Sequence, residues 1–138
     1  KGYNFRITEL QTAVGVAQLK KAPYFVKRKK EILRSYQNKL SGISDVRLLK
    51  FNPDGNIVPH RVVIFVPSAK KLIVHLTSLG IGVRSMFMPM HSMPAYHVKG
   101  DFPNTQEIFK TGVCLPSAPS LTDKNITFIC QSIKKFYI

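Results

Sequence analysis

The 138-residue sequence has no tryptophan, two cysteines and seven acidic residues. Two cysteines are too few for a disulfide framework, and the spacing of Cys114 and Cys130 does not match a zinc site, which favours ordinary thiols in the cytoplasm. No apolar run approaches the ~20 residues of a membrane-spanning helix, and no signal-peptide pattern is visible. Glycine-rich phosphate loops and clustered metal ligands are also missing, so no metal site is expected. The few, scattered carboxylates argue against a paired acid/base site within this chain.

Positive charge is abundant. The 21 Lys and Arg residues give a net charge of +14, while the 44% content of hydrophobic residues predicts a folded domain. Eight of the basic residues lie between residues 20 and 39, beside a single acidic residue, Glu31. This basic segment is compatible with a solvated helix face, a funnel for an anionic small molecule or a nucleic-acid surface. Because no nucleic-acid motif accompanies it, we expect no nucleic-acid partner, and we expect no membrane insertion.

A long helix is predicted at the start of the chain. Apolar residues recur at three- and four-residue steps over residues 8–40, and Thr8 with Gln11 forms a capping-box pattern. Pro23 lies inside this stretch and predicts a kink or a division into two helices. Gly42 is a plausible stop signal.

Shorter elements fill the rest of the chain. Residues 46–51 and 60–66 flank a turn and predict a β-hairpin. Periodicity and capping residues predict the remaining elements as follows: helix 68–79, strand 82–87, a long irregular segment 89–103, helix 104–111, an extended piece 113–115 and helix 122–137. This order predicts an α+β fold with a small, mainly antiparallel sheet covered by helices.

One segment carries a specific resemblance. Residues 2–19, GYNFRITELQTAVGVAQL, resemble the G-x-N-x-R-[MI]-T-E-[LI]-Q-A-A-[IV]-G-x-A-Q-L stretch of the DegT/DnrJ/EryC1/StrS family of pyridoxal-phosphate-dependent sugar-nucleotide aminotransferases. Further matches follow in the family's order: GIGVR at 80–84, PMH at 89–91, Pro94, Tyr96, Phe102-Pro103, Leu115-Pro116 and Leu121-Thr122. The resemblance covers nearly the whole chain but only about the last third of such an enzyme.

That coverage implies that this chain holds only part of the enzyme's functional residues. The resemblance implies the C-terminal small domain of a fold-type I pyridoxal-phosphate-dependent transferase, with residues 1–42 as an interface helix segment leading from an absent large domain and residues 43–138 as the small domain. In the family, the Schiff-base lysine, the ring that stacks on the cofactor and the carboxylate at its pyridine nitrogen lie upstream of residue 2. Pyridoxal 5'-phosphate would therefore be held mainly by that upstream portion, and this chain would have no catalytic lysine and no activity alone.

Candidate binding residues are carried over by position. The resemblance implies that Asn4 reaches across a dimer interface to hydrogen-bond the cofactor phosphate, with Arg6 beside it. Arg84, His91 and Tyr96 match residues around the substrate's sugar and diphosphate. Arginine can form a bidentate pair of hydrogen bonds with a phosphate, and a neutral histidine can donate a directed hydrogen bond. The alternatives are that Asn4 and Arg6 only organise the helix entry, and that Arg84, His91 and Tyr96 are an exposed strand-end charge, a loop histidine and a packing aromatic.

The implied reaction moves an amino group from glutamate to a nucleotide-linked 4-keto-6-deoxy sugar for polysaccharide or glycan synthesis, of the perosamine-synthase or bacillosamine type. The expected partners are the chain's own large domain, a second copy in a homodimer, and the two substrates. Two other interpretations stay open: a non-catalytic dimerisation or regulatory remnant of the family, and a basic nucleic-acid-binding α+β domain.

Overall fold

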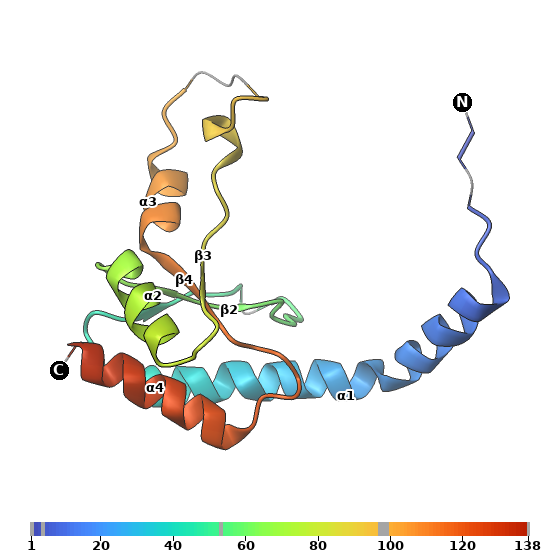
Figure 1. The fold of residues 1–138 in the computed structure, drawn as a ribbon, viewed down its shortest axis with the longest axis horizontal. Helices are drawn as coiled ribbons and strands as arrows, with labels where there is room; N and C mark the ends of the chain where they lie inside the picture. The colour runs from blue at the N-terminus through green and yellow to red at the C-terminus, as the bar shows by residue number, and fades with distance from the viewer. Residues whose placement is uncertain (1, 4, 53, 97–99, 138) are drawn as a thin grey trace.

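The computed structural model describes residues 2–3, 5–52, 54–96 and 100–137. Figure 1 shows a small sheet with helices packed along it and a long first helix that extends beyond the rest of the fold. The elements in chain order are α1 (Glu9–Leu40), β1 (Arg47–Leu48), β2 (Val62–Phe65), α2 (Ala69–Ser78), β3 (Arg84–Ser85), the 3-10 helix η1 (Met90–Ser92), α3 (Pro103–Thr111), β4 (Gly112–Leu115) and α4 (Asp123–Tyr137). The α+β prediction is confirmed.

The sheet is antiparallel, with strand order β1-β2-β4-β3. The predicted hairpin is confirmed, because Arg47 pairs with Phe65 and Leu48 with Ile64. β4, expected only as an extended piece, is a central strand that pairs with both β2 and β3. Its four residues are all buried, so it lacks the alternation of apolar and polar residues that marks a half-exposed strand. The outer strands β1 and β3 are shorter than predicted, at two residues each.

The hydrophobic core lies between one face of the sheet and three helices. Ile64 pairs with Val113 and Val62 with Leu115, so these four buried side chains project to the same face. Ile32, Tyr36 and Leu40 follow a four-residue step on α1 and are fully or almost fully buried against that face. The helices α2 and α4 complete the core with Leu72, Leu76, Ile126, Ile129 and Ile133.

Helix α1 begins and ends where its capping residues indicate. The backbone N–H of Gln11 donates to Thr8 Oγ1 at 3.3 Å, and the backbone N–H of Thr8 donates to Gln11 Oε1 at 3.0 Å, which confirms the capping box. Pro23 does not divide the stretch, because one helix of 32 residues runs through it. Figure 1 shows this helix changing direction in its N-terminal half, as a proline inside a helix favours. Gly42, just after the helix, has a φ of +86°, a conformation that glycine adopts readily.

A half-buried arginine, Arg28, joins the C-terminal half of α1 to the start of α4. Arg28 Nη2 donates to the Leu121 carbonyl at 2.6 Å and to Asp123 Oδ1 at 3.1 Å, while Nη1 contacts Glu31 Oε2 at 3.3 Å. The hydrogen bond to Asp123 raises the pKa of Arg28 above its usual value. These contacts of Arg28, which we call the Arg28 clamp, hold in place the part of α1 that carries the neighbouring Lys29.

Candidate functional site

A cationic cleft opens where α1 passes the end of the sheet. It encloses about 310 Å³ and receives residues from four separate parts of the chain. Lys29 comes from α1, Arg61 from the residue before β2 and Arg84 from β3, and the remaining lining residues are His60, Gly82 and residues 114–118. We refer to this cavity as the basic cleft.

Strand pairing, a cation–π contact and a hydrogen bond position the three cations, one for each. Arg84 is paired with Cys114 across β3 and β4, which places it at the wall of the cleft. The Arg61 guanidinium lies over the ring of Phe87, 5.4 Å from its centroid, a cation–π arrangement that restrains the side chain. Lys29 Nζ donates to the carbonyl oxygen of His60 at 2.9 Å.

The basic cleft is strongly unbalanced in charge. Its lining contains no Asp or Glu, and the ion pairs present among the described residues all involve Arg28. Partial burial lowers the pKa of Lys29, because desolvation disfavours its charged form. Three cations around one cavity without a counter-charge form a site suited to an anion.

The predicted site residues do not all meet in this cleft. Arg84 lines it, but His91 lies in η1 and stacks on Phe102 with ring centroids 4.6 Å apart. His91 Nε2 is buried and has no hydrogen-bond partner among the described residues. Tyr96 follows η1 and is 51% exposed. Of these three residues, only Arg84 therefore lines the basic cleft.

Lys29 and Arg61 were not singled out by sequence reasoning. Lys29 is one of eight cations in the basic segment, and Arg61 stands next to a predicted strand, so neither has a distinguishing local pattern. The only available signal was the concentration of positive charge over residues 20–39. Their meeting with Arg84 depends on contacts between residues far apart in the sequence.

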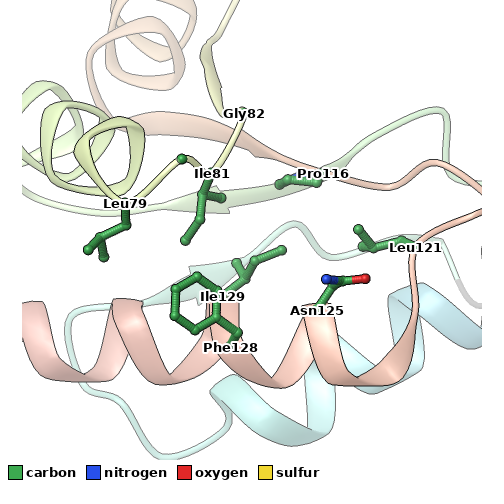
Figure 2. A pocket seen from close by; sticks show the side chains of 9 residues that line it. Leu79, Ile81, Gly82, Pro116, Leu121, Asn125, Phe128 and Ile129 are labelled. Atoms are coloured by element: carbon green, nitrogen blue, oxygen red, sulfur yellow. The ribbon is translucent and has the colours of Figure 1, made fainter.

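A second cavity, shown in Figure 2, is apolar. It encloses about 320 Å³ between the end of α2 and the helix α4, with Leu79, Ile81, Phe128 and Ile129 on its walls. Its polar side chain is that of Asn125, whose Oδ1 accepts a hydrogen bond from the backbone N–H of Thr122 at 3.2 Å. No titratable side chain lines this cavity, so of these two cavities the basic cleft is the better candidate site.

The N-terminal segment before α1 is exposed wherever the structure describes it. Asn4 lies outside the described residues. Arg6 belongs to an extended segment before α1, and its neighbours Phe5 and Ile7 are 86% and 68% exposed. A phosphate held there would be open to water on this chain's side. The described residues therefore do not enclose pyridoxal phosphate by themselves, and any such site needs walls from elsewhere.

Membrane and metal sites are not found in the described part of the chain. None of its helices combines the length and apolar character needed to cross a bilayer. Within the same residues, no group of three or more His, Cys, Asp or Glu side chains could hold a metal ion. Both cysteines are free and buried, and burial raises the pKa of the Cys130 thiol to about 11.

Comparison with known proteins defines the class of fold. The crystal structure of DesV from S. venezuelae superimposes with a TM-score of 0.92 over 99% of this chain and 38% of that chain, at 24% identity. Residues 1–134 match the model of the DegT/DnrJ/EryC1/StrS aminotransferase family. The fold is that of the C-terminal part of a fold-type I pyridoxal-phosphate-dependent aminotransferase. The chain belongs to the DegT/DnrJ/EryC1/StrS aminotransferase family.

Two curated relatives extend the comparison. GDP-perosamine synthase from Escherichia coli O157:H7 is 35% identical over 99% of this chain and 38% of its own length. The dTDP-4-dehydro-2,3,6-trideoxy-D-glucose 4-aminotransferase from Saccharopolyspora spinosa is 27% identical over 92% of this chain and 34% of its own length. The chain thus spans little more than a third of the relatives that it matches.

Proposed function

We propose that this chain is the C-terminal part of an enzyme that transfers an amino group from glutamate to a nucleotide-linked 4-keto-6-deoxy sugar, of the perosamine-synthase or bacillosamine type, in polysaccharide or glycan synthesis. The observation that carries the proposal is the 35% identity to a GDP-perosamine synthase along 99% of the chain. The basic cleft supports it, because a nucleotide-linked sugar carries a diphosphate that requires cations.

The chain's role in that enzyme follows from what it contains. Pyridoxal phosphate, when bound, supplies the electron sink for amino transfer, and we propose that its lysine and most of its site belong to the upstream portion. Asn4 and Arg6 would reach the cofactor phosphate from this chain. Arg84, His91 and Tyr96 would face the substrate, with Arg84 at the basic cleft, His91 in η1 and Tyr96 in the turn that follows η1.

The N-terminal half of α1 supports an assembly with the upstream portion or a second copy. It carries apolar side chains on several sides, and Leu10, Val14, Val16 and Leu19 are between 49% and 77% exposed. A helix that is apolar on several sides is normally buried in the folded protein. We therefore propose residues 1–42 as the interface segment, residues 43–138 as the small domain, and a homodimer as the working form.

Reconstitution tests the proposed function. The chain alone is expected to show no amination, whereas the chain joined to its upstream portion should aminate a GDP-linked 4-keto-6-deoxy sugar in a glutamate-dependent way. Product mass measures the reaction, and the upstream portion alone is the control. Absence of amination with GDP-, dTDP- and UDP-linked keto-sugars, or amination by the isolated chain, would contradict the proposal.

A second test concerns Asn4. In the joined protein, Asn4→Ala is expected to raise the Kd for pyridoxal phosphate about tenfold or more, since a hydrogen bond to a charged group contributes about 1.5–3 kcal/mol. Cofactor absorbance during dialysis measures retention. Asn38→Ala, at an exposed position of α1, is the matched control and should retain the parent affinity. An unchanged Kd for Asn4→Ala would remove Asn4 from the cofactor site.

A further inference from the structure

A third cavity lies between the start of α2 and the end of α3. It encloses about 700 Å³, more than twice the volume of the basic cleft. We propose that it binds a phosphate monoester of an apolar alcohol, a class of ligand that takes no part in the proposed amination. We call it the lysine-rimmed cavity, because its exposed rim carries Lys70, Lys71 and Lys110 above a floor that contains Ala69, Ile73 and Phe109.

The lysine-rimmed cavity and the basic cleft open on opposite faces of β3. Ser85 lines the former and Arg84 lines the latter, and consecutive residues of a strand project to opposite faces of the sheet. Figure 1 shows α2 and α3 at the other end of the molecule from the N-terminal half of α1. The cavity is therefore separate both from the basic cleft and from the exposed apolar part of α1.

Backbone contacts fix the elements that border the cavity. The backbone N–H of Val66 donates to the carbonyl oxygen of Thr111 at 2.9 Å, which joins the end of β2 to the end of α3. Gly112 also lines the cavity, and it lies so close to α3 that a Cβ there would be 2.6 Å from the carbonyl oxygen of Ile108. Walls that are held in this way require little ordering when a ligand binds, which favours binding.

The floor of the cavity offers apolar surface to a ligand. Ala69 is buried, while Ile73 and Phe109 are half-buried and leave part of their side chains open to the cavity. Cavities of about 300–1,000 Å³ with mainly apolar walls and a few polar groups are typical of small-molecule sites. A hydrocarbon chain on this floor would remove its own CH₂ groups and these side chains from water, which is favourable.

The rim of the cavity favours an anionic head group. Lys70, Lys71 and Lys110 are exposed, and none of them forms an ion pair with a described carboxylate. Among the described residues that line the cavity there is no Asp or Glu. A phosphate monoester carries a charge of about −1.5 to −2 at pH 7, so it balances three ammonium groups better than a single carboxylate does. The combination of floor and rim therefore matches an amphiphilic phosphate.

Binding of decyl phosphate tests the proposal. Calorimetric titration of the joined protein, below the concentration at which this amphiphile forms micelles, is expected to show one site per chain whose affinity falls as salt is raised. Butyl phosphate should bind about a hundredfold more weakly, because its shorter chain buries fewer CH₂ groups. Inorganic phosphate and the neutral amphiphile decyl glucoside should show no measurable binding, since each lacks one of the two interactions.

Variants locate the bound amphiphile. Lys71→Gln and Lys110→Gln, one from each helix, should each weaken decyl phosphate binding about fivefold or more, because each removes a charge-assisted contact. Ser85→Leu places a larger side chain at the cavity wall and should weaken binding about tenfold or more. Lys124→Gln and Ser120→Leu change exposed residues outside the cavity and should retain the parent affinity. Circular dichroism confirms that each variant is folded.

Several results would overturn the proposal. Equal affinities for decyl phosphate and decyl glucoside would mean that apolar contact alone accounts for binding, and equal affinities for decyl phosphate and inorganic phosphate would mean that charge alone does. No binding of decyl phosphate, or equal losses in the cavity and control variants, would also reject it. Displacement of decyl phosphate by GDP would assign the cavity to a nucleotide instead. These measurements do not depend on amination, so they remain decisive if the proposed function fails.

Discussion

Replacement of Tyr36 by alanine is expected to lower the free energy of unfolding by about 3–5 kcal/mol, the range for removing a large buried aromatic side chain. Tyr36 is 0% exposed in the centre of the core, where α1 packs against the sheet. Its hydroxyl donates to the carbonyl oxygen of Pro116 at 3.0 Å, which ties α1 to the segment after β4. Urea unfolding followed by circular dichroism measures the change.

Two variants separate packing from hydrogen bonding at this position. Tyr36→Phe keeps the ring but leaves the Pro116 carbonyl without its donor, so a loss of about 1–3 kcal/mol is expected. Tyr24→Ala removes a tyrosine of the same helix that is 60% exposed and should change stability by no more than about 0.5 kcal/mol. Equal losses for Tyr36→Ala and Tyr24→Ala would contradict the assignment of Tyr36 to the core.

The buried hydroxyl of Tyr36 is also expected to make the free energy of unfolding depend on pH. Burial is the largest cause that raises the pKa of Tyr36 above its usual value of about 10. The unfolded chain therefore loses the phenolic proton at a lower pH than the folded chain does. The stability contributed by the neutral hydroxyl is fully present below about pH 10 and declines as the pH rises above it. Tyr36→Phe should flatten that alkaline decline.

Replacement of Gly112 by alanine is the second change with a large expected effect. A Cβ at this position would lie 2.6 Å from the carbonyl oxygen of Ile108 and 2.2 Å from Cγ of Met86. The Met86 side chain can move away, but the Ile108 oxygen belongs to the backbone of α3. Since Gly112 opens the central strand β4, we expect the variant to lose about 3 kcal/mol or more, at the upper end for overpacking.

A double variant identifies the contact responsible. Met86→Ala combined with Gly112→Ala relieves the side-chain contact and leaves the backbone contact, so stability should recover only in part. Gly15→Ala in α1 is the matched control, because no atom outside its own helix lies within 4 Å of the new Cβ. This control should stabilise the helix by about 0.5–1 kcal/mol. An unchanged melting temperature for Gly112→Ala would contradict the close approach of the Ile108 carbonyl oxygen to Gly112.

Several features of the fold were predictable from short stretches of sequence. The Thr8–Gln11 capping box, the hairpin that pairs β1 with β2, and the amphipathic helices α2 and α4 are each encoded by residues near one another in the chain. Local hydrogen bonds and the periodicity of apolar residues are sufficient to specify such elements. The motif of residues 2–19 likewise predicted the family that the comparison confirmed.

Other features depended on packing between distant segments. Residues 112–115 form the central strand because β2 and β3 pair on either side of them, and no local pattern distinguishes that place from an extended loop. The basic cleft likewise joins Lys29, Arg61 and Arg84 from three elements. A run of positive charge indicates an anionic partner, but it does not specify which cations share a cavity. Their convergence results from the long-range packing of α1 against the end of the sheet, which sequence periodicity does not encode.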